Sequence, residues 1–130
     1  MGVIEGTTSL KSWKGSYDFA VDGGAQGSIP LRSNDGALPA GSVVMGGYLE
    51  VITQLTGVGA SVAVQTEGAA DTQAVAAING APWSTQGRKS VIPAFTGATS
   101  LKTTQARTPA AVISGANLTA GKFDVVLFYR

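Results

Sequence analysis

The stretch Asn117-Leu-Thr-Ala-Gly-Lys-Phe-Asp-Val-Val-Leu-Phe-Tyr-Arg130 is a turn followed by the clearest β-strand pattern in the chain. Successive side chains of a strand point to opposite faces, so residues 122–129 divide into two sets. One set is apolar and predicts a core face: Phe123, Val125, Leu127 and Tyr129. The other set becomes apolar only towards its end, as in a strand whose far half is covered, for example by another subunit: Lys122, Asp124, Val126 and Phe128. Because so apolar a strand would aggregate as an exposed edge, we expect it inside a sheet.

The composition fits one small domain. At 130 residues, with 44% of them hydrophobic, the chain can build a single compact core. Eighteen glycines and many Ala, Val, Ser and Thr residues favour short strands joined by tight turns over helices. Only 13% of the residues are charged, about half the usual share for a soluble domain. Two explanations stay open: a surface of uncharged Ser, Thr and Gln, or a surface that is largely covered in an assembly.

Charge, cysteine content and hydropathy argue against several classes of partner. The net charge is +1 and the basic residues are scattered, with Arg88 and Lys89 the only adjacent pair, which is unlike a nucleic-acid surface. Without cysteine there is no disulfide framework and no thiolate nucleophile. Residues 1–12 lack the basic start and apolar run of a signal peptide, and no run approaches the ~18 apolar residues of a membrane span. We therefore expect a soluble chain, made in the cytoplasm, that binds neither nucleic acid nor membrane.

Segments with strand patterns follow one another along the chain, separated by Gly, Pro and Asn-Gly turns. They are residues 14–22, 27–32, 42–54, 60–67, 71–79, 89–93, 100–104, 110–114 and 122–129. Counted conservatively, they make about eight strands at the spacing typical of a sandwich or barrel. We predict an all-β, antiparallel β-sandwich over residues 13–130, with jelly-roll topology favoured. Residues 1–12 are predicted to form an irregular N-terminal arm.

Three of these segments carry a more specific signal. Pro30 cannot donate a ladder hydrogen bond, which favours an edge strand. The pair Gly46-Gly47 predicts a bulge or a bend where the strand crosses from one sheet to the other. Residues 71–79 are ambiguous because Asp71 could cap a short helix, but the surrounding short strands favour another strand.

The ionisable residues do not form a catalytic pattern. The chain has no histidine, which removes Ser-His and Cys-His catalysis and the commonest transition-metal ligand. Asp18 and Asp22 share one face of the predicted strand 14–22, but a solvated strand face explains them better than the facing carboxylate pair of a glycosidase. A calcium loop around Asp22 or Asn34-Asp35 would lack the usual Asp-x-Asp-x-Asp-Gly run. We therefore expect no catalytic residue, no cofactor site and no metal site.

Two stretches are candidates for contact with a partner. In the predicted loop before residue 90, a tryptophan lies near two basic residues, and this contact loop comprises Trp83, Arg88 and Lys89. The arm carries apolar side chains that could anchor it on a neighbouring subunit: Val3, Ile4 and Leu10.

Four stretches together carry a resemblance to known proteins. They are Tyr17-Asp-Phe-Ala-Val-Asp-Gly-Gly24, Leu31-Arg-Ser-Asn-Asp-Gly-Ala-Leu-Pro39, Pro82-Trp-Ser-Thr-Gln-Gly-Arg-Lys-Ser90 and Ala120-Gly-Lys-Phe-Asp-Val-Val-Leu-Phe-Tyr129. With these stretches, which span most of the chain, the sequence resembles a family of small tail- and head-associated structural proteins of bacteriophages. The stretches are structural patterns and not catalytic signatures, so the resemblance implies no catalytic residue and no enzyme.

The resemblance implies a virion protein, above all a capsid decoration (cement) protein that lies on the outside of the shell as an oligomer, commonly a trimer. Its partners would be the major capsid protein and copies of itself, and it would be assembled in the host cytoplasm. Low charge and small-residue strands agree with this, because such a protein buries weakly charged surface. The alternative is a carbohydrate- or receptor-binding module of a phage fibre or tail, with Trp83 and Arg88 in its contact loop.

Overall fold

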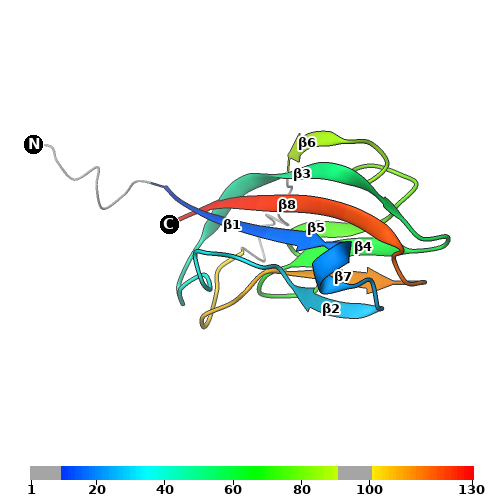
Figure 1. The fold of residues 1–130 in the computed structure, drawn as a ribbon. Helices are drawn as coiled ribbons and strands as arrows, with labels where there is room; N and C mark the ends of the chain where they lie inside the picture. Colours follow the sequence, from blue (N-terminus) through cyan, green and yellow to red (C-terminus); the bar gives the residue numbers. More distant parts are fainter. Residues whose placement is uncertain (1–9, 91–100) are drawn as a thin grey trace, which may run out of the picture.

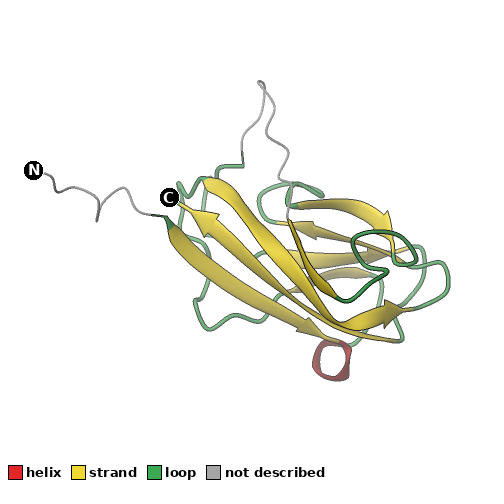
Figure 2. Ribbon diagram, turned by 90° about the horizontal axis from the view of Figure 1, so that it is seen from above, coloured by secondary structure: helices red, strands yellow, loops and turns green. Residues whose placement is uncertain are grey.

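The computed structural model describes residues 10–90 and 101–130, which form two four-stranded antiparallel sheets packed face to face (Figures 1 and 2). The first sheet has the order β1-β8-β3-β6 and the second has the order β2-β7-β4-β5. The first sheet consists of β1 (Lys11–Asp18), β3 (Val44–Thr56), β6 (Gly87–Ser90) and β8 (Ala120–Tyr129). The second consists of β2 (Gly27–Pro30), β4 (Ser61–Gln65), β5 (Gln73–Ala77) and β7 (Ala110–Ser114). The predicted all-β sandwich is confirmed.

The C-terminal strand β8 lies inside the first sheet, between β1 and β3, as its sequence predicts (Figure 1). Phe123, Val125 and Leu127 are buried on its core face. Val126 points to the opposite face but is only 8% exposed. The strand is therefore apolar on its outer face only where neighbouring side chains cover it.

The centre of the core is a group of three aromatic rings around Phe123. The centroid of the Phe123 ring lies 5.3 Å from that of Tyr17 in β1 and 4.8 Å from that of Trp83. The second sheet covers this group with aliphatic side chains, among them Val62 and Ile113. Burial of one such large side chain contributes about 1.5–3 kcal/mol, so each ring contributes substantially to the cohesion between the two layers.

Strand β3 contains the irregularity predicted at Gly46-Gly47. Its register against β8 shifts between Val44 and Gly46, and both glycines have positive φ angles, 157° and 156°. A bulge of this kind needs residues that tolerate such angles, which explains the glycine pair. However, both halves of β3 pair with β8, so the strand stays in one sheet, and the expected crossing between sheets is wrong.

The first predicted strand is wrong in its second half and begins earlier than expected. Lys11 and Ser12 belong to β1 and not to the arm. At its other end, Asp18 becomes the N-cap of a single helical turn, α2 (Phe19–Asp22), and its side chain accepts a hydrogen bond from the amide of Ala20. The capping interaction competes successfully with the strand alternation over these four residues.

The remaining segments agree with the sequence to different degrees. β2 is an edge strand, as Pro30 predicts, and residues 73–77 form a strand and not a helix. Lys102 makes only an isolated bridge with Val43, so residues 101–104 are not a regular strand. Residues 91–93 and 100, which were expected to continue two strands, lie outside the described residues.

Candidate interaction surfaces

The carboxylates of the described residues serve the fold. Asp22 pairs with Arg32, with 2.9 Å between Oδ1 and Nε, and its other oxygen accepts a hydrogen bond from the backbone amide of Asp18. Asp35 accepts a hydrogen bond from the backbone amide of Lys14. Within residues 10–90 and 101–130, no three carboxylate side chains lie together as metal ligands would, and no helix is long and apolar enough to span a membrane.

Tyr17 has the most buried ionisable side chain near these acids, and its environment keeps it neutral. Its hydroxyl donates a 2.6 Å hydrogen bond to the carbonyl oxygen of Gly23. Burial, followed by the negative charges of Asp22 and Asp18, raises the pKa of Tyr17 to about 12. A phenol with this pKa stays protonated at neutral pH and acts as a hydrogen-bond donor that fixes the chain after α2.

Trp83 is a core residue, and this corrects the expectation that it offers a contact surface. Its side chain is fully buried, and its indole nitrogen donates a 3.1 Å hydrogen bond to the carbonyl oxygen of Val62. A buried tryptophan with a satisfied N–H has no free face on which a sugar could stack. Trp83 is buried because it packs against β4 and β8, which are distant from it in the sequence.

Arg88 and Lys89 lie on β6 and point to opposite faces of the first sheet. Arg88 is exposed on the outer face, where its guanidinium carbon lies 4.3 Å from the centroid of the Tyr48 ring. Lys89 is opposite the buried Leu49 in the register, and its ammonium group donates to the carbonyl oxygen of Thr85. The structure therefore separates the three side chains of the predicted contact loop.

The outer face of the first sheet carries a stripe of charges across its strands, in which the two central carboxylates, Asp124 and Glu50, are flanked by the cations Lys14 and Arg88. Lys14 lies 3.7 Å from Asp124, and Arg88 lies 3.5 Å from Glu50. Tyr48 packs between Arg88 and Phe128, with 6.3 Å between the two ring centroids. Both side chains of the Arg88–Glu50 pair are exposed, so this pair contributes little to stability.

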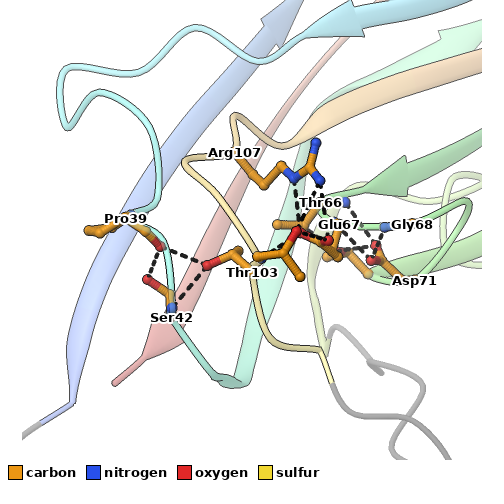
Figure 3. Close-up of polar contacts among 10 residues, drawn as sticks. Pro39, Ser42, Thr66, Glu67, Gly68, Asp71, Thr103 and Arg107 are labelled. Atoms are coloured by element: carbon orange, nitrogen blue, oxygen red, sulfur yellow. Dashed lines mark hydrogen bonds and ion pairs between the residues drawn. The ribbon is translucent and has the colours of Figure 1, made fainter.

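A second polar cluster closes one end of the sandwich (Figure 3). Glu67, which follows β4, accepts two hydrogen bonds from the guanidinium of Arg107, at 2.9 and 3.2 Å, and two from Thr104. Asp71 accepts hydrogen bonds from three successive backbone amides, those of residues 66–68. Nearby, the hydroxyls of Ser42 and Thr103 both donate to the carbonyl oxygen of Pro39. The Glu67 contacts fasten the loop between β4 and β5 to the irregular segment before β7, and the bond from Thr103 to Pro39 joins that segment to the chain before β3.

The predicted anchor of the arm is only partly within the described residues. Leu10 is half exposed at the start of β1, directly before Lys11, which pairs with Tyr129. Val3 and Ile4 lie outside the described residues. The role of these three side chains stays a prediction.

No protein family and no curated protein sequence matches this chain. The fold, however, matches chains in two solved bacteriophage structures. A chain of the acid-stable capsid of Helicobacter pylori bacteriophage KHP30 gives a TM-score of 0.60 at 18% identity, over 92% of this chain and 86% of that chain. A chain of the cyanophage Pam1 capsid asymmetric unit gives a TM-score of 0.64 at 18% identity, over 93% of this chain and 84% of that chain. Phage capsids contain this fold. The resemblance to phage structural proteins, expected from the sequence, is thereby confirmed at the level of the fold.

Proposed function

We propose that this protein is a structural protein of a bacteriophage virion that decorates the capsid shell as an oligomer. The observation that carries the proposal is the fold match to chains of two phage capsid structures, over more than four fifths of every chain compared. Because each match covers most of this chain and most of the capsid chain, the capsid chains are close to this one in length. The shared unit is a whole small sandwich and not a fragment of a large subunit.

The strand order supports a more specific topology. Eight strands in the orders β1-β8-β3-β6 and β2-β7-β4-β5 are distributed between the two sheets as two interleaved Greek keys would be. We assign this arrangement to the jelly roll, an architecture used by viral capsid proteins among others.

In this proposal the partners are the major capsid protein and further copies of this chain, with a trimer as the expected oligomer and the host cytoplasm as the site of assembly. The role is structural and needs no reaction. The sequence supports this because it has no histidine or cysteine. In the structure, the carboxylate of Asp22 forms an ion pair with Arg32, and that of Glu67 forms one with Arg107. The arm residues Val3, Ile4 and Leu10 are proposed to anchor the protein to the shell.

The alternative, a carbohydrate- or receptor-binding module of a fibre or tail, makes its contact through the loops around Trp83 and Arg88. Because the Trp83 side chain is buried, the remaining support is the pair of Arg88 and Tyr48 on the outer face of the first sheet. We therefore favour the capsid shell over the tail.

Immunogold labelling of purified virions with an antibody against this protein tests the location. The proposal predicts gold particles distributed over the surface of the head. Gold confined to fibres or tail would support the alternative module, and virions without any label would contradict a virion role altogether.

A further inference from the structure

The charged residues are distributed very unequally between the two sheets. The strands β2, β4, β5 and β7 contain no charged residue at all, on either face. The strands of the first sheet contain eight, including Lys14, Glu50, Arg88 and Asp124. The two sheets cover the same core, so core packing alone does not require this difference. The difference in charge therefore relates to what contacts the outer face of each sheet.

The outer face of the second sheet is formed by small, uncharged side chains. Its orientation follows from the inward, buried positions of Val62, Val64 and Ile113 on the central strands. The outward residues of the four strands are Ser28, Pro30, Ser61, Ala63, Gln65, Val75, Ala77, Ala110, Val112 and Ser114, of which Ala63 and Ala110 are almost fully buried. Val75 is the largest exposed apolar side chain among them, at 60%. Side chains of this size leave a flat surface that another flat surface can approach closely.

This uncharged surface continues over one end of the sandwich. The loop between β3 and β4 and the segment after β5 line a shallow apolar hollow of about 340 Å³, formed by residues 57–60 and 77–79. Val58 at its rim is fully exposed. The loop between β7 and β8 adjoins them, because the amide of Thr119 donates to the carbonyl oxygen of Thr56. These loops are uncharged as well, so sheet and loops form one continuous region, which we call the uncharged surface.

We propose that copies of this chain associate with one another through the uncharged surface. A surface with no formal charge leaves the charged groups of a partner desolvated and unpaired, so its most favourable partner is also uncharged. Among the surfaces of the described residues, the uncharged surface itself meets this condition. The outer face of the first sheet, with its charged stripe, does not.

The area of the uncharged surface indicates which parts of it an interface between two copies must include. At the usual strand spacing, four strands of about five residues cover only about 300 Å². A stable interface buries about 800 Å² on each partner. The sheet face alone is therefore too small, and the contact has to include the loops around Val58. This inference deepens the oligomeric part of the proposed function and rests on it.

The test introduces one charge at a time and measures the mass of the free protein. Val75→Glu changes the sheet face and Val58→Glu changes the loops, and both side chains are exposed, so the monomer can still fold. Thr53→Glu is the matched control, because Thr53 is exposed on β3 of the first sheet, opposite Lys122. Sedimentation velocity over a concentration series gives the mass as a multiple of 13.1 kDa, and far-UV circular dichroism verifies the fold.

We expect the wild-type protein and Thr53→Glu to be oligomers of equal mass. Val75→Glu and Val58→Glu should raise the dissociation constant at least about tenfold, since each would bury an unpaired charge. A monomeric wild-type protein, or oligomers that withstand both substitutions, would overturn the inference. If Val75→Glu instead weakened binding to capsids without changing the mass, the shell and not a second copy would cover this surface. Oligomers broken by Val75→Glu that nevertheless ignore capsids would support the inference and contradict only the proposed function.

Discussion

The indole nitrogen of Trp83 donates a 3.1 Å hydrogen bond to the carbonyl oxygen of Val62, so the segment after β5 is fixed to the middle of β4. The same indole ring packs on Phe123 of β8, in the opposite sheet. One side chain thus joins both layers of the sandwich. Its role is structural, although its loop position suggested a contact residue.

Replacement of Trp83 should therefore affect stability. Trp83→Phe removes the hydrogen-bond donor and part of the ring, and we expect the free energy of unfolding to fall by about 2 kcal/mol. Urea denaturation followed by circular dichroism measures the change. Val21→Ala, at an exposed position of α2 outside the uncharged surface, is the control and should stay within about 0.5 kcal/mol of wild type. An unchanged midpoint for Trp83→Phe would contradict the core role.

The ion pair of Glu67 and Arg107 should persist into acid. Hydrogen bonds from Arg107 and then Thr104 lower the pKa of Glu67 from 4.5 to about 2. A carboxyl whose pKa is lower in the folded state stabilises the fold fully above its unfolded pKa, and loses this effect as the pH falls towards the folded pKa. The Tm of Glu67→Gln should thus lie below that of wild type from pH 7 to 5, and the difference should close between pH 4.5 and 2.

Thermal denaturation of both proteins across this pH range measures the difference. Glu50→Gln serves as the control, because Glu50 and Arg88 form a more exposed pair, 42% and 63% for the two side chains. Its effect on Tm should be smaller. A Tm difference for Glu67→Gln that does not depend on pH would show that the charge of Glu67 is not what stabilises the loop.

Gly121 should not tolerate a side chain. Its φ is 133°, and a Cβ atom there would lie 2.8 Å from the Cα atom of Leu55 on β3, which is backbone and cannot move aside. We expect Gly121→Ala to destabilise the protein by at least about 2 kcal/mol. Gly80→Ala is the matched control, because the nearest atom would be 3.7 Å away, an ordinary contact. Equal urea midpoints for the two variants would contradict the close approach of β8 and β3.

Removal of the arm should leave the sandwich intact. Because β1 begins at Lys11, deletion of residues 1–9 removes no residue of strands β1 to β8, and the Tm should stay near that of wild type. The same deletion is expected to abolish attachment to the shell, since Val3 and Ile4 are the proposed anchor. A full-length variant with Val3→Asp and Ile4→Asp should reproduce the defect. Normal loading of capsids by the truncated protein would show that the anchor lies elsewhere.

The sequence predicts those parts of the fold in which local pattern and tertiary burial agree. The alternation in β8 predicts which of its side chains are buried. The glycine pair of β3 predicts the bulge, because glycine tolerates the backbone angles that a bulge requires. Prediction failed at Asp18, where a local capping bond competes with strand alternation, and at Lys102, where alternation over a few residues was too short to specify a strand.

The candidate site was less predictable, because its properties arise from the topology. Trp83 follows a turn and reads as a loop residue, and only the packing of β4 against β8 makes its place a core position. Likewise, the sequence shows that charged residues are few. Only the strand order shows that those within strands all lie in the first sheet. The long uncharged runs 51–66 and 72–87 were the available signal.

The most direct test of a capsid-decorating role is binding of the purified protein to undecorated shells of its phage, measured by co-sedimentation over a range of protein concentrations. The proposal predicts that the protein pellets with shells and that binding saturates at a fixed number of copies per shell. A protein that stays in the supernatant at every concentration, while its fold is intact by circular dichroism, would contradict it.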